Sequence, residues 1–270
     1  MRRTLLATLF FLGTTTRLLA ADLSFDVRET AGIRRFDYPA TARLTLPEAS
    51  SSRLVLTHNG KPISAQIAPH PDNSRQVTID FKVTCAPHET QHFELKPDNS
   101  TAPTKPPTRT ITATRDGNDW LVVGTNALTY RIPGDLKGFV SSVRHDNSEW
   151  LRDNSPGITL TSRSGKSCTL GSNDFPVSAS RVLRQGSHCC ELEFKAAGAT
   201  PDWQDVSAVV TLTFPLAKSW FELNLAINDP ADRLASASPR PELSGHAQTA
   251  PRRLRRRRSD LPHAHRGPGE

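Results

Sequence analysis

The chain has 270 residues and a formal net charge of +7, with 34 Lys and Arg against 27 Asp and Glu. This length is enough for one large or two ordinary domains. The positive charge is confined to the two ends, because residues 22–230 contain 22 basic and 23 acidic residues. The near-zero net charge of residues 22–230 does not indicate a polyanion partner for this part of the chain. We therefore do not expect a nucleic-acid-binding protein.

Residues 1–21 have the pattern of a cleaved export signal. Arg2 and Arg3 form a basic start, residues 5–12 form a short apolar run, and small residues follow near position 21. A membrane anchor needs about 20 apolar residues, and Arg17 interrupts this run too early. We therefore predict a secreted or periplasmic protein with no membrane span after signal cleavage.

Residues 22–97 read as a small β-barrel or sandwich domain. Asn59 and Gly60 are the preferred pair for a tight hairpin turn, and they separate two β-rich runs. A later run alternates apolar and polar residues, as in a half-buried strand. The apolar residues that share one face of this predicted strand are Val77, Ile79, Phe81 and Val83.

Residues 98–107 are rich in Pro, Ser and Thr and are typical of a linker. From 108 to 230 the chain again reads as short strands separated by turn signals, and no window has convincing helical periodicity. Near its end, one face of a predicted strand carries Phe221, Leu223, Leu225 and Ile227. We predict an all-β chain in which the second unit is a partial β-supersandwich.

Residues 231–270 have no alternation, no aromatic residue and no Val or Ile. Such a segment cannot bury enough apolar surface to offset its ordering entropy, so we predict a disordered tail. Six arginines fall within residues 252–258, and they would bind a polyanion with strong salt dependence. Because the composition changes abruptly, our hypothesis is that residues from about 235 are a frameshifted tail on a truncated chain.

Export makes the four cysteines candidates for disulfides. Cys189 and Cys190 are adjacent, and neighbours on a strand point to opposite faces, so they are poor partners for each other. We predict one bridge from Cys168 to either Cys189 or Cys190. A metal site is not favoured, because paired C-x-x-C spacing is lacking, and no cofactor is predicted.

Two tryptophans are candidate carbohydrate-stacking residues, because sugar rings stack on exposed aromatic faces. Trp150 and Trp203 both lie beside turn-like residues. The alternative for each is packing in the core or at its rim. No G-x-S-x-G motif places a nucleophile, and the sequence does not pair the carboxylates that glycoside hydrolysis would need. The catalytic residues, if any, are therefore unknown.

Two stretches together resemble a known family. "YPATARLTLP" is followed by a hairpin containing "GKPISAQ", and "GFVSSVRHDNSEWL" is similar to a hairpin that begins the supersandwich in galactose-mutarotase-like domains of glycosidases and polysaccharide lyases. The order of small barrel, linker and supersandwich resembles the N-terminal portion of exo-rhamnogalacturonan lyase-like secreted proteins, the RIFT-barrel group. The resemblance covers residues 28–230. No segment of this sequence has the pattern of that group's helical toroid, so we carry over no catalytic position from the family.

This resemblance implies the N-terminal accessory β-domains of an exported, polysaccharide-acting, lyase-like protein. The chain is then expected to be truncated and catalytically silent by itself, with a poly- or oligosaccharide as its partner. One alternative is a complete secreted β-sandwich protein that binds glycans or cell-surface partners. Two others are a small enzyme that uses an acidic cluster and a polyanion binder that acts through its basic tail.

Overall fold

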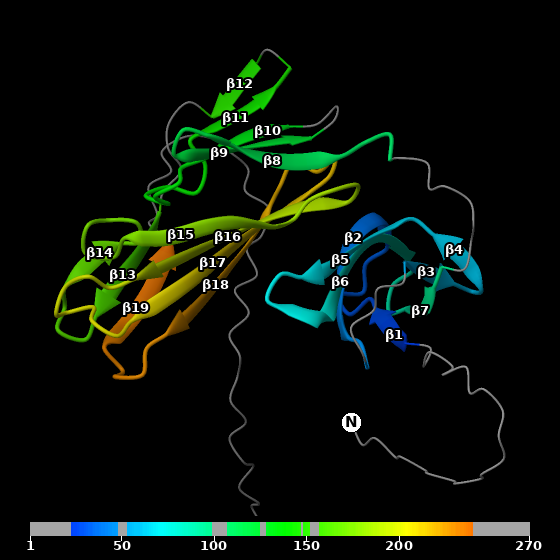
Figure 1. Ribbon diagram of the computed structural model, residues 1–270, viewed down its shortest axis with the longest axis horizontal. Coiled ribbons are helices and arrows are strands. Elements are labelled where there is room, and N and C mark those ends of the chain that lie inside the picture. The colour runs from blue at the N-terminus through cyan, green and yellow to red at the C-terminus, as the bar shows by residue number, and fades with distance from the viewer. Residues whose placement is uncertain are drawn as a thin grey trace, which may run out of the picture. The chain divides into compact units, whose positions relative to one another are not determined.

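The computed structural model describes residues 23–47, 53–98, 107–124, 128–146, 148–151 and 157–239. Every regular element within these ranges is a β-strand, and all strand pairs are antiparallel, which confirms the predicted all-β class (Figure 1). The predicted export signal at 1–21 lies outside the described residues, as do 99–106 of the predicted linker.

Residues 23–98 form two sheets, and we call them the N-terminal β domain. The four-stranded sheet has the order β1 (Leu23–Arg28), β7 (Thr90–Pro97), β3 (Leu54–His58) and β4 (Lys61–Ile63). The three-stranded sheet has the order β2 (Arg35–Thr45), β6 (Asn73–Cys85) and β5 (Ala65–His70).

Three phenylalanines fill the space between these two sheets. The Phe81 ring in β6 lies 5.0 Å from that of Phe93 in β7, and Phe25 in β1 lies 5.8 and 5.6 Å from them. Burial of each such ring stabilises the fold by about 1.5–3 kcal/mol. The predicted alternation in β6 is confirmed, because the four apolar residues of one face are buried: Val77, Ile79, Phe81 and Val83.

The predicted hairpin at Asn59 and Gly60 is also confirmed. These residues join β3 to β4, and their φ angles are 51° and 72°. Positive φ at both central positions is the geometry of a two-residue turn whose twist matches that of the strands. The turn places His58 directly opposite Lys61 in the strand register.

Residues 107–239 form three sheets, and we call them the C-terminal β domain. The five-stranded sheet has the order β12 (Ser148–Leu151), β11 (Ser142–His145), β10 (Thr129–Ile132), β9 (Asp119–Gly124) and β8 (Ile111–Asp116). The four-stranded sheet consists of β15 (Val177–Arg184), β16 (Cys189–Ala197), β17 (Ser207–Pro215) and β18 (Glu222–Asn228). The three-stranded sheet has the order β14 (Ser167–Thr169), β13 (Ile158–Ser162) and β19 (Leu234–Pro239).

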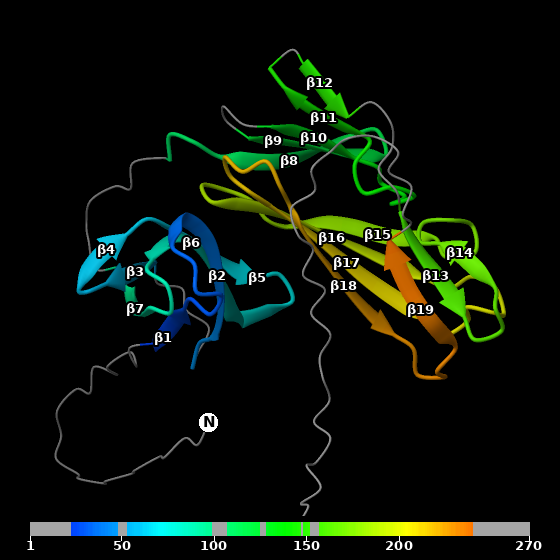
Figure 2. The same ribbon diagram turned by 180° about the vertical axis from the view of Figure 1, so that it is seen from behind.

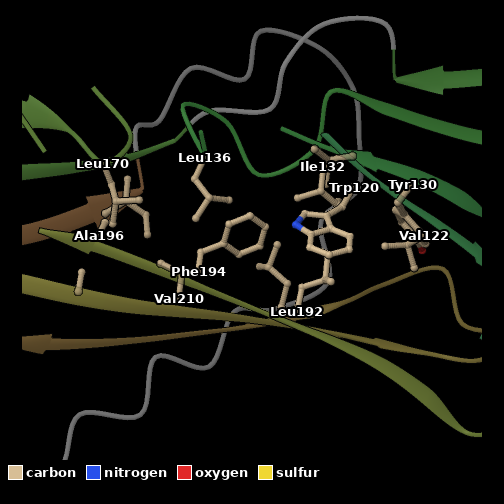
Figure 3. Close-up of a cluster of buried hydrophobic side chains, with 14 of the residues drawn as sticks. Trp120, Val122, Tyr130, Ile132, Leu136, Leu170, Leu192, Phe194, Ala196 and Val210 are labelled. Carbon is tan, nitrogen blue, oxygen red and sulfur yellow. The ribbon is translucent and has the colours of Figure 1, made fainter. Parts of the chain in front are cut away.

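A single large core holds these sheets together. Figures 1 and 2 show the sheet of β8–β12 facing the sheet of β15–β18. In Figure 3, Trp120 and Ile132 from the first sheet point toward Leu192 from the second. Two-sheet packing of this kind requires inward-facing apolar residues at alternate positions of both sheets. β16 and β17 satisfy that requirement with the buried residues Leu192, Phe194, Ala208, Val210 and Leu212.

The predicted amphipathic strand near the end of this domain is β18. Phe221, Leu225 and Ile227 pack against the core, as the period-two pattern predicted. Leu223 shares the pattern but is exposed. Because β18 pairs only with β17 among the described residues, its other edge has no neighbour there.

The predicted disordered tail requires a correction at its start. The sequence placed residues 231–270 in that tail, but the structure forms β19 from Leu234–Pro239. This strand pairs with β13, and Leu234 and Ala237 pack against the domain core. Ala and Ser have low strand propensity, so only the neighbouring strand explains β19. The rest of the predicted tail, including the arginine run, lies outside the described residues.

Candidate functional site

A cleft of about 640 Å³ lies where the two β domains meet. It takes residues from β3, β4, β6 and β7 of the N-terminal β domain and from three separate segments of the C-terminal β domain. Its lining consists of His58, Ile63, Ser64, Lys82, Val83, Thr84, Gln91, Phe93, Pro107, Thr108, Arg109, Ser187, His188 and Leu216. Pockets of 300–1,000 Å³ are typical of small-ligand sites, so this cleft is the candidate site.

Gln66 fixes the loop that carries His188 into the cleft. Its side-chain amide donates to the carbonyl of Cys189 at 3.2 Å, and its Oε1 accepts from the backbone N–H groups of His188 at 2.9 Å and Cys189 at 3.2 Å. A Cβ atom at Gly186 would lie 2.8 Å from this same oxygen. A side chain at 186 would therefore displace the Gln66 amide from these hydrogen bonds.

A buried ion cluster joins the two domains behind the cleft. Arg184 of β15 donates from Nε and Nη2 to both oxygens of Asp80 in β6, at 2.6 and 3.1 Å, and its Nη1 contacts Glu191 of β16. Thr41 donates to Asp80 at 2.7 Å. The Arg184 side chain is only 5% exposed. Arg184 therefore compensates the buried negative charge of Asp80.

The cleft itself carries positive charge. Lys82 and Arg109 are exposed, and neither forms an ion pair with any described carboxylate. Among the described lining residues there is no Asp or Glu. Burial lowers the pKa of His188, and the nearby Lys82 lowers it further against the opposing effect of Asp80, so this ring is neutral at pH 7. The lining thus offers two uncompensated cations and a neutral imidazole.

An aromatic wall and several hydroxyl groups complete the lining. The His58 ring stacks on Phe93 with centroids 4.8 Å apart, and its Nδ1 donates to the carbonyl of His92 at 2.9 Å. That bond leaves Nε2 of His58 as the acceptor. In the second imidazole, Nδ1 of His188 lies 2.9 Å from the Ser187 hydroxyl. Further hydroxyl groups come from Ser64, Thr84 and Thr108.

Of the two predicted stacking tryptophans, Trp150 is exposed and Trp203 is not. Trp150 in β12 exposes 65% of its surface, and its ring lies 6.0 Å from that of His145. This exposure is what the prediction required, although stacking itself stays a prediction. Trp150 lies on the β11–β12 hairpin and does not line the cleft.

The prediction for Trp203 is wrong, because this side chain is only 2% exposed. Its ring packs edge-on against Phe175, with centroids 6.3 Å apart. Gly198 makes room for this segment, since a Cβ at Gly198 would lie 1.9 Å from the Trp203 carbonyl oxygen. A ring buried in this way has no free face for a sugar.

The predicted disulfide is also corrected. Among the described residues, all four cysteines are free and buried, so neither Cys189 nor Cys190 is bridged to Cys168. Cys168 and Cys190 belong to the core, while the Sγ atom of Cys189 lies 3.9 Å from the Gln66 amide. Burial raises the pKa of Cys168 to about 11 and that of Cys190 to about 12. These protonated thiols have no nucleophilic role.

The described residues contain no helix that is long and apolar enough to cross a membrane. They also contain no group of three or more His, Cys, Asp or Glu residues that is arranged to hold a metal ion.

Sequence reasoning missed the cleft. No motif or spacing in the sequence marks His58, Lys82, Arg109 or His188 as a functional residue. The alternation in β6 does indicate that Lys82 and Thr84 point away from the buried face. Lys82 and His188 line the same cleft although more than a hundred residues separate them in the chain. No sequence pattern indicates that these two segments meet.

No family model and no curated protein matches the chain. Among solved structures, it is similar to a protein in glycosyl hydrolase family 38 from Enterococcus faecalis, with 9% identity and a TM-score of 0.44, over 80% of this chain and 32% of that one. It is also similar to an alpha-mannosidase from Enterococcus faecalis V583, with 8% identity and a TM-score of 0.40, over 76% and 30%. The chain spans about a third of the length of these proteins, and neither activity is carried over to it.

Proposed function

We propose that this chain provides glycan-binding accessory β-domains of an exported, polysaccharide-acting, lyase-like protein, and that it binds an acidic oligosaccharide in the cleft. The observation that carries the proposal is the lining itself. Its described residues combine two uncompensated cations, Lys82 and Arg109, with an aromatic wall and include no carboxylate. The similarity of two sequence stretches to the lyase-like group also supports it.

The composition of the lining fits an acidic sugar better than other small ligands. A sugar ring has an apolar face of C–H groups, which suits the half-buried Ile63 and the ring of His58, which stacks on the buried Phe93. Its hydroxyl groups match the serine and threonine hydroxyls and the imidazole nitrogens. A sugar carboxylate would accept charge-assisted hydrogen bonds from Lys82 and Arg109.

The accessory role means binding without bond cleavage. Both ring nitrogens of His58 have hydrogen-bonding neighbours, His92 and Asn59, and Nδ1 of His188 is engaged by Ser187. The nearest buried carboxylates, Asp80 and Glu191, are held by Arg184 and are not part of the lining. We therefore expect no acid–base chemistry on a bound glycan.

Calorimetric titration tests the proposal directly. The full chain is titrated with an oligogalacturonate and with a neutral maltooligosaccharide of the same length, at low and at physiological salt. We expect binding of the acidic sugar that weakens with salt, and little binding of the neutral one. The double variant Lys82→Ala/Arg109→Ala should lose at least about tenfold in affinity.

The matched control removes two exposed cations outside the cleft, Arg144 and Lys195. Equal losses in the control and in the cleft variant would show that binding is a general charge effect, which contradicts the proposal. Ultraviolet absorbance from unsaturated sugar ends during the titration would contradict the silent accessory role, and it would indicate an eliminating enzyme.

A further inference from the structure

A second group of exposed aromatic side chains lies on β2 and before β18. We call Phe36, Tyr38 and Trp220 the aromatic rim. Phe36 and Tyr38 are 67% and 37% exposed, and Trp220 is half-buried. Exposed aromatic residues that are gathered in this way, rather than scattered singly, mark interaction sites.

The segment that carries the rim is held in a fixed shape. The buried carboxylate of Glu29 accepts hydrogen bonds from the backbone N–H groups of Ala31 at 2.9 Å, Gly32 at 2.7 Å and Ile33 at 3.2 Å. It also accepts one from His88 at 3.3 Å. A site fixed before binding loses less entropy when its ligand arrives.

A β-bulge then sets the direction of the rim side chains. The register of β2 against β6 shifts between Arg35 and Tyr38, and Asp37 has a φ of 43°. The backbone N–H of Asp37 donates to the Thr84 hydroxyl at 3.2 Å. Bulges often re-aim side chains beside functional sites. Here the bulge leaves Phe36 with most of its ring in solvent.

Tyr38 is held between an arginine and a tryptophan. The Arg35 guanidinium lies 4.7 Å from the centre of its ring, and the Trp220 ring stacks with it at 6.3 Å and 28°. Trp220 belongs to the C-terminal β domain, so both domains build the rim. Arg34, whose guanidinium lies 5.9 Å from the Phe36 ring, forms no ion pair with any described carboxylate. Arg35 is paired with Glu29 at 3.5 Å.

The rim is continuous with the cleft. Tyr38 lies opposite Val83 in the β2–β6 register, and Val83 lines the cleft. Thr84, which accepts the hydrogen bond from Asp37, lines it as well. On the other domain, Leu216 of the lining precedes Trp220 by one short turn. Through the contact of Asp37 with Thr84, the strand segment that carries the rim therefore touches the cleft lining.

We propose that the aromatic rim is a second glycan subsite, which takes further sugar rings of a chain whose acidic unit occupies the cleft. This inference rests on the proposed function. The flat rings of Phe36 and Trp220 offer apolar faces to sugar C–H groups, and Arg34 offers a cation to an acidic substituent. Affinity then rises with the length of the glycan, and the acidic unit in the cleft remains necessary for binding.

The test is a series of oligogalacturonates of increasing length, titrated into the full chain and into three single variants. In the unchanged protein, affinity should rise about three- to tenfold once the oligomer is long enough to reach the rim. Phe36→Ala should abolish that rise and leave the affinity of the shortest binding oligomer unchanged. Trp220→Ala should reduce the rise. Because Phe36 is mostly exposed, its loss is not expected to unfold the protein.

Trp150→Ala is the matched control, since Trp150 is equally exposed but lies on the β11–β12 hairpin. The inference is overturned if Trp150→Ala removes the rise, or if Phe36→Ala weakens short and long oligomers alike. It is also overturned, with the proposed function intact, if length has no effect but Lys82→Ala/Arg109→Ala still abolishes binding. A chain that binds no acidic oligomer of any length would overturn both.

Discussion

Arg184 is the residue on which the contact between the two domains depends most. It is buried between Asp80 and Glu191, and it satisfies carboxylates from both domains. A buried ion pair adds little net stability compared with apolar packing, but breaking it leaves an uncompensated charge in the interior. The cluster therefore specifies how β6 meets β15 and β16.

Replacement of Arg184 should be strongly destabilising. Arg184→Met leaves the buried Asp80 without its cation and leaves Glu191 with only the more distant Arg43 at 3.6 Å, so we expect a loss of about 3–5 kcal/mol in the free energy of unfolding. Arg181→Met is the control, because Arg181 also pairs across the domains, with Asp72, but its side chain is 36% exposed against 5% for Arg184. Its loss should stay below about 1 kcal/mol. Urea unfolding measures both, and similar losses would contradict the account.

The two predicted tryptophans show what a sequence leaves open at this scale. Trp150 and Trp203 have similar turn-like neighbours, yet one is exposed and the other is buried. Burial of Trp203 depends on the close approach of Gly198 and on Phe175, and that approach is a property of the folded chain. Local composition therefore predicted the exposure of only one of the two correctly.

The two tryptophans should differ in stability and not only in exposure. Trp203→Ala removes a core ring and should lower the free energy of unfolding by about 3–5 kcal/mol. Trp150→Ala removes an exposed ring and should change it by no more than about 0.5 kcal/mol. Chemical denaturation of the two variants checks this. A Trp203→Ala protein as stable as the parent would mean that this ring is not in the core.

Glu29 should make the rim segment sensitive to acid. Burial alone would raise its pKa, but four backbone N–H donors outweigh burial and lower it from 4.5 to about 2. A lowered pKa adds stability that is full above about pH 4.5 and is lost as the pH falls toward 2. The stability difference between the parent and Glu29→Gln should therefore close across this window. A difference that is independent of pH would contradict the role given to the carboxylate.

At the scale of elements, strand periodicity predicted most of the fold. The alternation in β6 and β18 and the Asn59-Gly60 turn were sufficient to identify these elements, because each depends on local pattern. The bulge at Asp37 and the strand β19 were not predicted. Both depend on a partner strand, β6 for the bulge and β13 for β19, and a local pattern does not identify that partner.

Two glycines with the same backbone conformation provide a test at this scale. Gly165 and Gly171 have φ angles of 83° and 88°, but a Cβ at Gly165 meets open space, while one at Gly171 would lie 1.8 Å from the Asp135 carbonyl oxygen. Gly165→Ala should lower the free energy of unfolding by about 1–2 kcal/mol through strain alone. Gly171→Ala should lower it further, because backbone must move. Thermal unfolding measures the stability of both variants. Equal losses of stability would show that the backbone at Asp135 moves away from the new Cβ at little cost.

At the scale of the whole molecule, the sequence predicted two β units and a neutral body but not their joint surface. The cleft needs Lys82 of β6, Arg109 after the linker and His188 before β16, and no periodicity links these three positions. Gln66 and Gly186 bring them together through contacts between residues far apart in the chain. A site whose residues come from two domains therefore cannot be predicted from the sequence pattern of either domain alone.

Hydrogen–deuterium exchange of the full chain, with and without an oligogalacturonate, tests the central claim most directly. The account predicts slower amide exchange in peptides that cover 58–64, 107–109 and 187–188, because these segments line the cleft from both domains. A neutral maltooligosaccharide should leave the same peptides unchanged. Protection that is confined to 142–151, or absent throughout while the sugar is bound, would contradict a binding site between the domains.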